Sequence, residues 1–136
     1  MAGAAREPRG PRELGPPAGP VGPALIWCPF ASEDDAALIA AALLDERLIA
    51  CANILPVMRS LFAWNGQRGD EREVGVLFKT DAALLDAAIA RLAQLHPYDE
   101  PAAIGWRADA ATQGTRAWLG DLVHAEPHLI HAEPQG

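Results

Sequence analysis

The fold of this chain is decided by residues 49–80, which read IACANILPVMRSLFAWNGQRGDEREVGVLFKT. The first half is extended, and Pro56 divides it at a bulge or kink because proline has no N–H to donate to a strand ladder. Asn65 and Gly66 tolerate positive φ and mark a reversal, and after a polar stretch a further strand runs over 73–80. The stretch therefore predicts a hairpin longer than strands of the typical ~5 to 6 residues.

A strand and a helix precede this hairpin. Residues 25–28 form a short apolar run ended by Pro29, as expected of a buried strand. Ser32 is a good N-cap with an acidic residue three positions later, so a helix begins there. Its apolar face follows the i, i+3, i+4, i+7, i+8 spacing and comprises Ala36, Ile39, Ala40, Leu43 and Leu44.

A second helix, a strand and a third helix follow the hairpin. The second helix is predicted over 81–95 and stops before Pro97, and its apolar face comprises Leu85, Ala88, Ile89, Leu92 and Ala93. A short strand over 102–106 and a final helix over 115–123 complete the chain. The order βαββαβ plus a C-terminal helix predicts an α+β, ferredoxin-like fold with both main helices on one face of an antiparallel sheet. Many unrelated functions share this fold, so it does not decide the function.

The length and composition predict one folded domain between two tails. The chain has 136 residues, and its patterned part spans 24–123. Residues 1–23 consist mainly of Pro, Gly, Ala and Arg, which bury too little surface to offset the entropy of ordering. Residues 124–136 hold three histidines and two prolines, which predicts a second disordered tail that binds metal only weakly.

The charge and the cysteine content narrow the partners and the compartment. A net charge of −7 with a single lysine argues against a nucleic-acid partner, since phosphates are held by clustered Lys and Arg. No apolar run reaches the ~20 residues that cross a bilayer, and the first residues lack the apolar core of a secretory signal. Two cysteines are too few for a disulfide framework, so we expect free thiols in the cytoplasm.

Three stretches resemble the CutA divalent-cation tolerance family, in the family's own order. Residues 48–56 (LIACANILP) resemble its Ala-Cys-x-Asn-x-x-Pro strand. Residues 60–80 are similar to its Ser-x-x-x-Trp-x-Gly hairpin and returning Lys-Thr strand. Residues 96–101 resemble its His-Pro-Tyr-x-x-Pro turn, and the match covers about 24–123. The chain departs from the family at Val57 (glycine is usual), Phe62 (an aromatic hydroxyl is common) and Asn65 (glutamate is usual), and the missing acid weakens a cation site at the hairpin tip.

The resemblance implies a homotrimer with a role in tolerance of copper and other divalent metals, and no known reaction. The sequence supports the assembly, because a long hairpin that extends past the helices exposes backbone groups and the side chains of Leu61, Phe62 and Trp64. A neighbouring subunit covers such an edge in a closed threefold ring. The tryptophans are expected to be core or interface anchors.

Three residues are candidate metal ligands: His96, Cys51 and Cys28. His96 ends the second helix beside Tyr98, Asp99 and Glu100, a set that suits Zn or Cu, and the alternative is a histidine that caps the helix or stabilises the turn. Cys51 lies between small apolar residues and is either a buried structural thiol or a ligand. Cys28 ends a strand, where a thiolate that reaches the surface suits Cu(I), and the alternative is core packing. No Cys-x-x-Cys pair exists, so a bound metal is not required for folding.

Two other functions compete with a trimeric metal-binding protein. A PII-like small-molecule sensor requires basic residues for phosphates at a cleft between subunits, and the chain offers few beyond Lys79, Arg59, Arg72 and Arg107. An enzyme that uses Tyr98, Asp99 or Glu100 as acid or base has no substrate signature. No nucleophile motif and no glycine-rich phosphate loop occurs in the sequence, so we expect no enzymatic activity.

Overall fold

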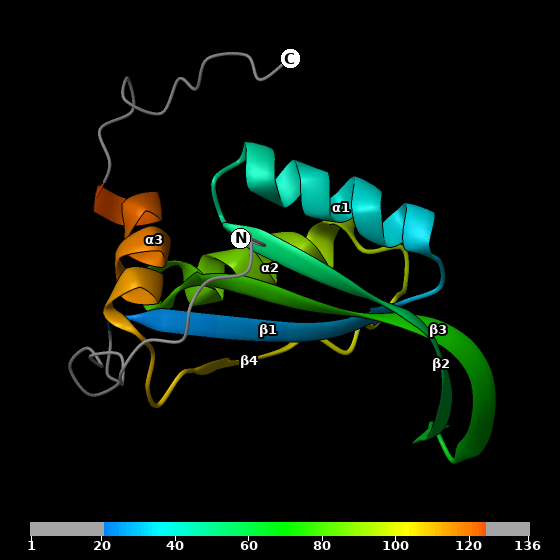
Figure 1. Cartoon of the computed structure of the whole chain (residues 1–136). Coiled ribbons are helices and arrows are strands. Elements are labelled where there is room, and N and C mark those ends of the chain that lie inside the picture. Colours follow the sequence, from blue (N-terminus) through cyan, green and yellow to red (C-terminus); the bar gives the residue numbers. More distant parts are fainter. Residues whose placement is uncertain (1–20, 125–136) are drawn as a thin grey trace.

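The computed structural model describes residues 21–124. The elements are, in chain order, β1 (Pro23–Phe30), α1 (Glu33–Asp45), β2 (Cys51–Trp64), β3 (Gln67–Asp81), the 3₁₀ turn η1 (Ala82–Leu84), α2 (Leu85–Leu95), β4 (Ile104–Arg107) and α3 (Gln113–His124) (Figure 1). The four strands form one antiparallel sheet in the order β2-β3-β1-β4. The predicted ferredoxin-like fold is confirmed, and the predicted tails lie outside the described residues except for positions 21–23 and 124.

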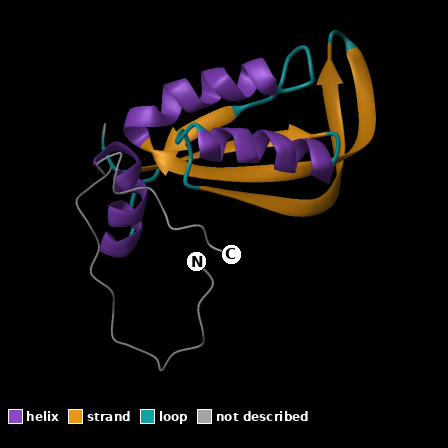
Figure 2. Cartoon of the chain, turned by 90° about the horizontal axis from the view of Figure 1, so that it is seen from above, coloured by secondary structure: helices purple, strands orange, loops and turns teal. Residues whose placement is uncertain are grey.

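The core lies between the sheet and the two main helices. Alternate residues of β1 and of the inner part of β3 point to this side, and small and branched residues of α1 and α2 pack onto them. Figure 2 shows both helices on the same face of the sheet. Gly105 permits close packing of α2 on β4, because an added Cβ would lie 2.7 Å from Ile89 and 2.8 Å from Leu85.

The predicted start of α1 and most of both apolar faces are observed, but α2 begins at Leu85 and not at the predicted Asp81, because Ala82–Leu84 form the 3₁₀ turn η1. The Ser32 side chain accepts a hydrogen bond from the N–H of Asp35 at 3.1 Å, which caps α1. Leu44 and Ala93 are exposed, so each predicted apolar face is narrower than expected. Leu44 faces a shallow hollow that it shares with Trp118 of α3 instead of the core.

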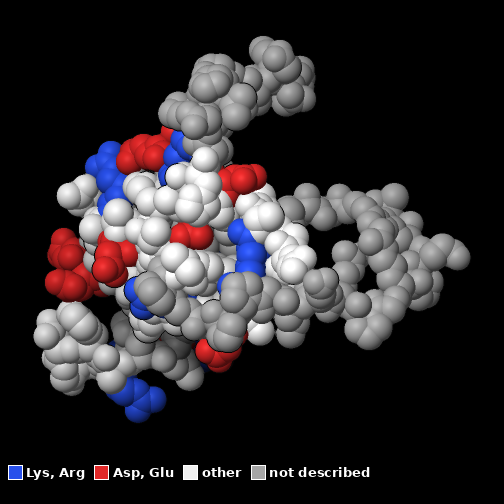
Figure 3. Space-filling model, turned by 90° about the vertical axis from the view of Figure 1, so that its left-hand side faces the viewer, with Lys and Arg blue, Asp and Glu red and all other residues white. Residues whose placement is uncertain are grey.

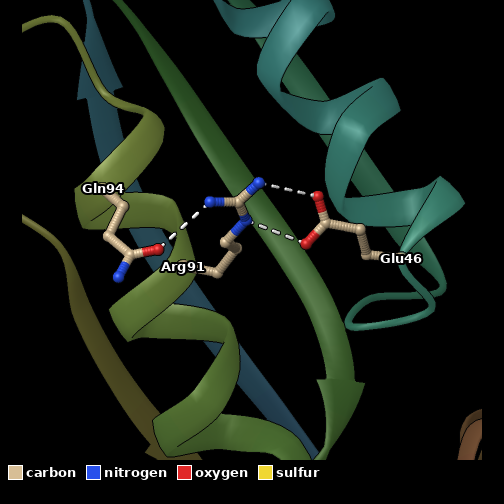
Figure 4. Close-up of polar contacts among 3 residues, drawn as sticks. All are labelled: Glu46, Arg91 and Gln94. Carbon is tan, nitrogen blue, oxygen red and sulfur yellow. Dashed lines mark hydrogen bonds and ion pairs between the residues drawn. The ribbon is translucent and has the colours of Figure 1, made fainter.

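A polar link joins the ends of the two main helices at the surface. Arg91 of α2 donates two hydrogen bonds to the Glu46 carboxylate, at 2.9 and 3.1 Å, and a third to Gln94 at 3.1 Å (Figure 4). Both charged side chains are exposed, so water screens the pair and its contribution to stability is small.

The hairpin is longer than the sequence predicts, because β3 begins at Gln67 and not at Glu73. Asn65 (φ 52°) and Gly66 (φ 74°) make a two-residue turn, which brings the polar residues after it directly into register with β2. The predicted irregularity at Pro56 is confirmed: the register shifts between Ile54 and Val57. The outer part of the hairpin extends past both helices and curves away from the sheet (Figures 1 and 2).

β1 also continues beyond its predicted end and includes Pro29. Pairing with β4 covers only the first part of β1, Ala24 to Trp27. One side of Pro29 therefore has no strand beside it, and the missing N–H interrupts no ladder there.

Candidate functional site

The first predicted ligand, Cys28, lies in the core. Its side chain is fully buried, and this burial, assisted by the negative charge of Glu73, raises the pKa of the thiol to about 12. The expectation that this strand end reaches the surface is wrong, because β1 continues to Phe30. Since the thiolate is the metal ligand, a buried protonated thiol is poorly suited to bind copper.

Cys51, the second predicted ligand, lies on the opposite face of the sheet from Cys28. Cys28 pairs with Val76 of β3 and Cys51 pairs with Lys79, and two β3 residues three apart point to opposite faces. Cys51 is half-buried, and its thiol lies 3.5 Å from the side-chain oxygen of Asn53. The two thiols therefore cannot share a metal ion within one chain.

His96, the third predicted ligand, caps α2 and stabilises the turn that follows. Its backbone N–H donates to the Leu92 carbonyl, and its ring stacks on Phe30 with centroids 4.4 Å apart. Nδ1 accepts the N–H of Tyr98 at 3.1 Å, so the ring proton lies on Nε2, which donates to the Pro29 carbonyl at 2.9 Å. Both ring nitrogens are occupied, as the capping alternative predicts.

These three residues do not fit a metal site within a single chain. They lie apart, and in the described part of the chain no group of three or more His, Cys, Asp or Glu side chains is arranged to hold a metal ion. Cys28 packs in the core and His96 caps α2, while Cys51 lies half-buried on the other face of the sheet.

The structure instead presents a cleft of about 1020 Å³ between the outer hairpin and residues 97–102. Its floor is a contact that the sequence analysis missed, in which the Tyr98 hydroxyl donates to Oε2 of Glu73 at 2.7 Å. The sequence does signal Glu73, because it alternates with Val74 and therefore points to the other face of β3. Only the tertiary structure shows that the turn after α2 reaches that face.

Tyr98 is not a suitable acid or base at neutral pH. Burial raises the pKa of its hydroxyl well above the ordinary value, and the hydrogen bond and charge of Glu73 raise the pKa further. Asp99 and Glu100, the other two candidates, are exposed at the rim of the cleft.

The cleft is acidic and aromatic. Glu71, Glu73, Asp99 and Glu100 line it together with aromatic rings from the hairpin and the turn, and no lysine or arginine is among its lining residues. The arginines Arg59 and Arg72 are paired opposite each other on the other face of the hairpin. At the far end of the molecule, which carries α3, acidic and basic side chains are interspersed (Figure 3).

The structure belongs to one class of protein, the ferredoxin-like proteins whose second and third strands form a long hairpin that extends past the helices. The sequence profile described as "CutA1 divalent ion tolerance protein" matches residues 24–121. The chain therefore belongs to the CutA1 divalent ion tolerance family, and the resemblance noted from its motifs is confirmed.

Individual relatives agree with this assignment. The divalent-cation tolerance protein CutA of Pyrococcus horikoshii is 36% identical over 95 residues, which are 70% of this chain and 92% of the relative. Human protein CutA is 35% identical over 116 residues, 85% of this chain and 64% of the relative. The crystal structure of CutA from Xylella fastidiosa superimposes with a TM-score of 0.71 at 32% identity, covering 75% of this chain and 98% of that one.

None of the helices within residues 21–124 has the length and apolar character needed to cross a membrane.

Proposed function

We propose that the chain works as a homotrimer that contributes to tolerance of copper or other divalent cations, as a binding protein without catalytic activity. The observation that best supports a trimer is the exposure of the outer edge of β2. This strand has 14 residues and is the last in the sheet. Its exposed apolar side chains include Leu55, Val57, Leu61 and Trp64. A long apolar edge is unstable in a monomer and favours pairing with another chain.

The opposite edge of the sheet supports the same proposal. β4 is short and terminal in the sheet, and Ile104 and Trp106 are 62% and 44% exposed. The two exposed edges lie on different sides of the subunit, so contacts between them are heterologous and close into a ring when the rotation is suitable.

Metal binding by the assembly is tested by calorimetric titration of the purified protein with Cu(II) and with Zn(II). Cys51 is the predicted ligand with the most accessible side chain, so Cys51→Ser is expected to weaken copper binding, while Cys28→Ser has little effect. Absence of binding at micromolar concentrations, or identical affinities for wild type and both variants, contradicts a metal site at these residues.

A second candidate function, a PII-like trimeric small-molecule sensor, is favoured by the cleft. Its volume of about 1020 Å³ accommodates an organic ligand. The lining lacks the basic residues that a nucleotide or another phosphorylated ligand requires. A rise in melting temperature with ATP that metals do not produce would favour the sensor over the metal protein.

We also place the protein in the cytoplasm. The support is that the two cysteines, Cys28 and Cys51, are free thiols on opposite faces of the sheet and offer no pair for a stabilising disulfide. Fractionation of cells that express the chain checks this: recovery with periplasmic or secreted markers contradicts it.

A further inference from the structure

The turn that follows α2, residues 97–102, is tied to the rest of the domain by few hydrogen bonds. In the described part of the chain, no backbone group of this turn bonds to another backbone group. The bonds that hold it belong to Tyr98, whose backbone N–H donates to Nδ1 of His96 at 3.1 Å and whose hydroxyl donates to Glu73 at 2.7 Å. One of the two ties therefore depends on the lone pair of an imidazole nitrogen.

The surroundings of His96 match a neutral ring. The residue is only 6% exposed, and its ring lies between those of Phe30 and Tyr98, with centroids 4.4 and 4.6 Å away. A neutral imidazole has one nitrogen that donates and one that accepts. Nε2 donates to the Pro29 carbonyl at 2.9 Å and Nδ1 accepts from Tyr98, so the neutral ring satisfies both partners.

Protonation of the ring changes only one of these two contacts in sign. An imidazolium donates from both nitrogens, so a proton on Nδ1 faces the N–H of Tyr98 and the hydrogen bond is replaced by the repulsion of two donors. The bond from Nε2 to the Pro29 carbonyl persists and becomes stronger, because the donor is charged. The ring is therefore expected to keep its place on β1, and the turn is the part that moves.

The charges around the ring make the protonated state accessible. Titratable side chains on the surrounding elements are Cys28 of β1, residues 33–35 of α1, Glu73 of β3, Arg91 of α2, and Asp99 and Glu100 of the turn. Arg91 is paired with Glu46 at the surface and burial keeps Cys28 a neutral thiol, so the remaining charges are negative. These charges and the negative end of α2 favour an imidazolium, while burial and the Tyr98 hydrogen bond favour the neutral ring.

We propose that His96 is a pH-sensitive latch, a side chain that holds the turn 97–102 when it is neutral and releases it when it is protonated. The turn, and with it the Tyr98 hydroxyl on Glu73, is held at high pH and released as the pH falls through the range in which histidines change charge. Residues 97–102 form the wall of the cleft across from the hairpin, so their release changes the surface that a neighbouring subunit contacts there. The latch itself acts within one chain and requires neither a metal ion nor the trimer.

The test uses the single tyrosine of the chain. Isotope labelling of tyrosine in the full chain gives one amide signal in NMR, that of Tyr98. Its protection against hydrogen exchange, corrected for the intrinsic rate at each pH, is expected to fall about 5-fold or more between about pH 7.5 and 5, the effect of losing one hydrogen bond. In protein labelled at histidine, Nδ1 of His96 is expected to become protonated with the same midpoint.

Three variants identify the group that titrates. His96→Asn places a side-chain oxygen near the position of Nδ1 and does not titrate, so the protection of Tyr98 is expected to become independent of pH. His124→Asn is the matched control, because it removes an exposed histidine at the end of α3, and it is expected to keep the pH dependence. Glu73→Gln is also expected to keep it, since the amide oxygen still accepts the Tyr98 hydroxyl but does not titrate.

Several results would overturn the proposal. Protection of Tyr98 that stays constant while His96 becomes protonated shows that the turn is held without the ring nitrogen. A pH dependence that persists in His96→Asn, or that is lost in Glu73→Gln, assigns the effect to another group. If His96→Asn does not fold, the wild-type signals decide: different midpoints for His96 and Tyr98, or a ring that is still neutral at about pH 5, contradict the latch.

Discussion

The inner and outer halves of the hairpin use the same backbone pairing but differ in what covers them. In the inner half, residues 51–54 pair with 76–79, and Val76 and Phe78 are fully buried beneath the helices. In the outer half, residues 58–64 pair with 67–73, and most side chains are exposed. Strand pairing alone therefore does not make a core, and the outer half requires a cover that this chain does not provide.

The largest difference in stability is expected between the alanine variants of two phenylalanines, Phe78 on β3 and Phe62 on β2. Phe78→Ala removes a fully buried ring and is expected to lower the free energy of unfolding by roughly 3 to 5 kcal/mol. Phe62→Ala removes a partly exposed ring from the outer half and is expected to cost clearly less. Urea denaturation of both variants at one protein concentration measures this, and equal losses would contradict the comparison.

The two faces of the inner half are expected to differ in thiol reactivity. In a Cys51→Ser variant the remaining Cys28 has a pKa raised from 9.0 to about 12 and no exposed surface. At pH 8 its alkylation by iodoacetamide is expected to be at least about 100-fold slower in the native protein than in urea, because only the thiolate reacts. In Cys28→Ser, the alkylation of the half-buried Cys51 is expected to be only slightly slower in the native protein than in urea. A native Cys28 that reacts as it does in urea would show that the core opens readily.

The missing cover of the outer half is tested by Trp64→Ala. If a neighbouring subunit covers this side chain, its removal is expected to weaken the trimer by roughly 2 kcal/mol or more per site. Light scattering over a dilution series measures the dissociation. Leu38→Ala is the control, since Leu38 is exposed on α1, away from the hairpin. A monomeric wild type, or a Trp64→Ala trimer as resistant to dilution as the control, would disprove the proposal.

The smallest effect on stability is expected when the ion pair on the other face of the hairpin is removed. Arg59 donates two hydrogen bonds to Asp70, at 2.9 and 2.7 Å, and both side chains are largely exposed. Solvent screening makes such a pair weak, so Arg59→Ala is expected to leave the urea midpoint unchanged within error. A clear loss of stability would indicate that this face is buried in the assembly.

Local sequence patterns predicted the elements well where one face is buried. The capping serine at 32, the apolar spacings of α1 and α2 and the bulge at Pro56 all depend on residues close together in the chain. The predictions were less accurate where pairing decides the structure. The polar residues 67–72 have little intrinsic strand propensity, and they are extended because the turn at Asn65 and Gly66 aligns them with β2.

The candidate site was predicted only in part. Tyr98, Asp99 and Glu100 were named as neighbours of His96, and all three line the cleft. The metal-ligand hypothesis placed them around the imidazole. Tyr98 does lie beside the ring, with centroids 4.6 Å apart, but both ring nitrogens are already occupied, Nε2 by the Pro29 carbonyl and Nδ1 by the N–H of Tyr98. Glu73 was assigned only to a strand, because its partner Tyr98 is 25 positions away and no local pattern links them.

The sequence by itself determined the order of the elements, the long hairpin and the family, because helix caps, apolar periodicity and ordered motifs are local properties of the chain. The tertiary structure decided which side chains meet. Strand register placed Cys28 and Cys51 on opposite faces, and the turn after α2 brought Tyr98 to Glu73. Contacts of this kind depend on the pairing of distant segments, since the free energy that selects them comes from burial across the whole domain.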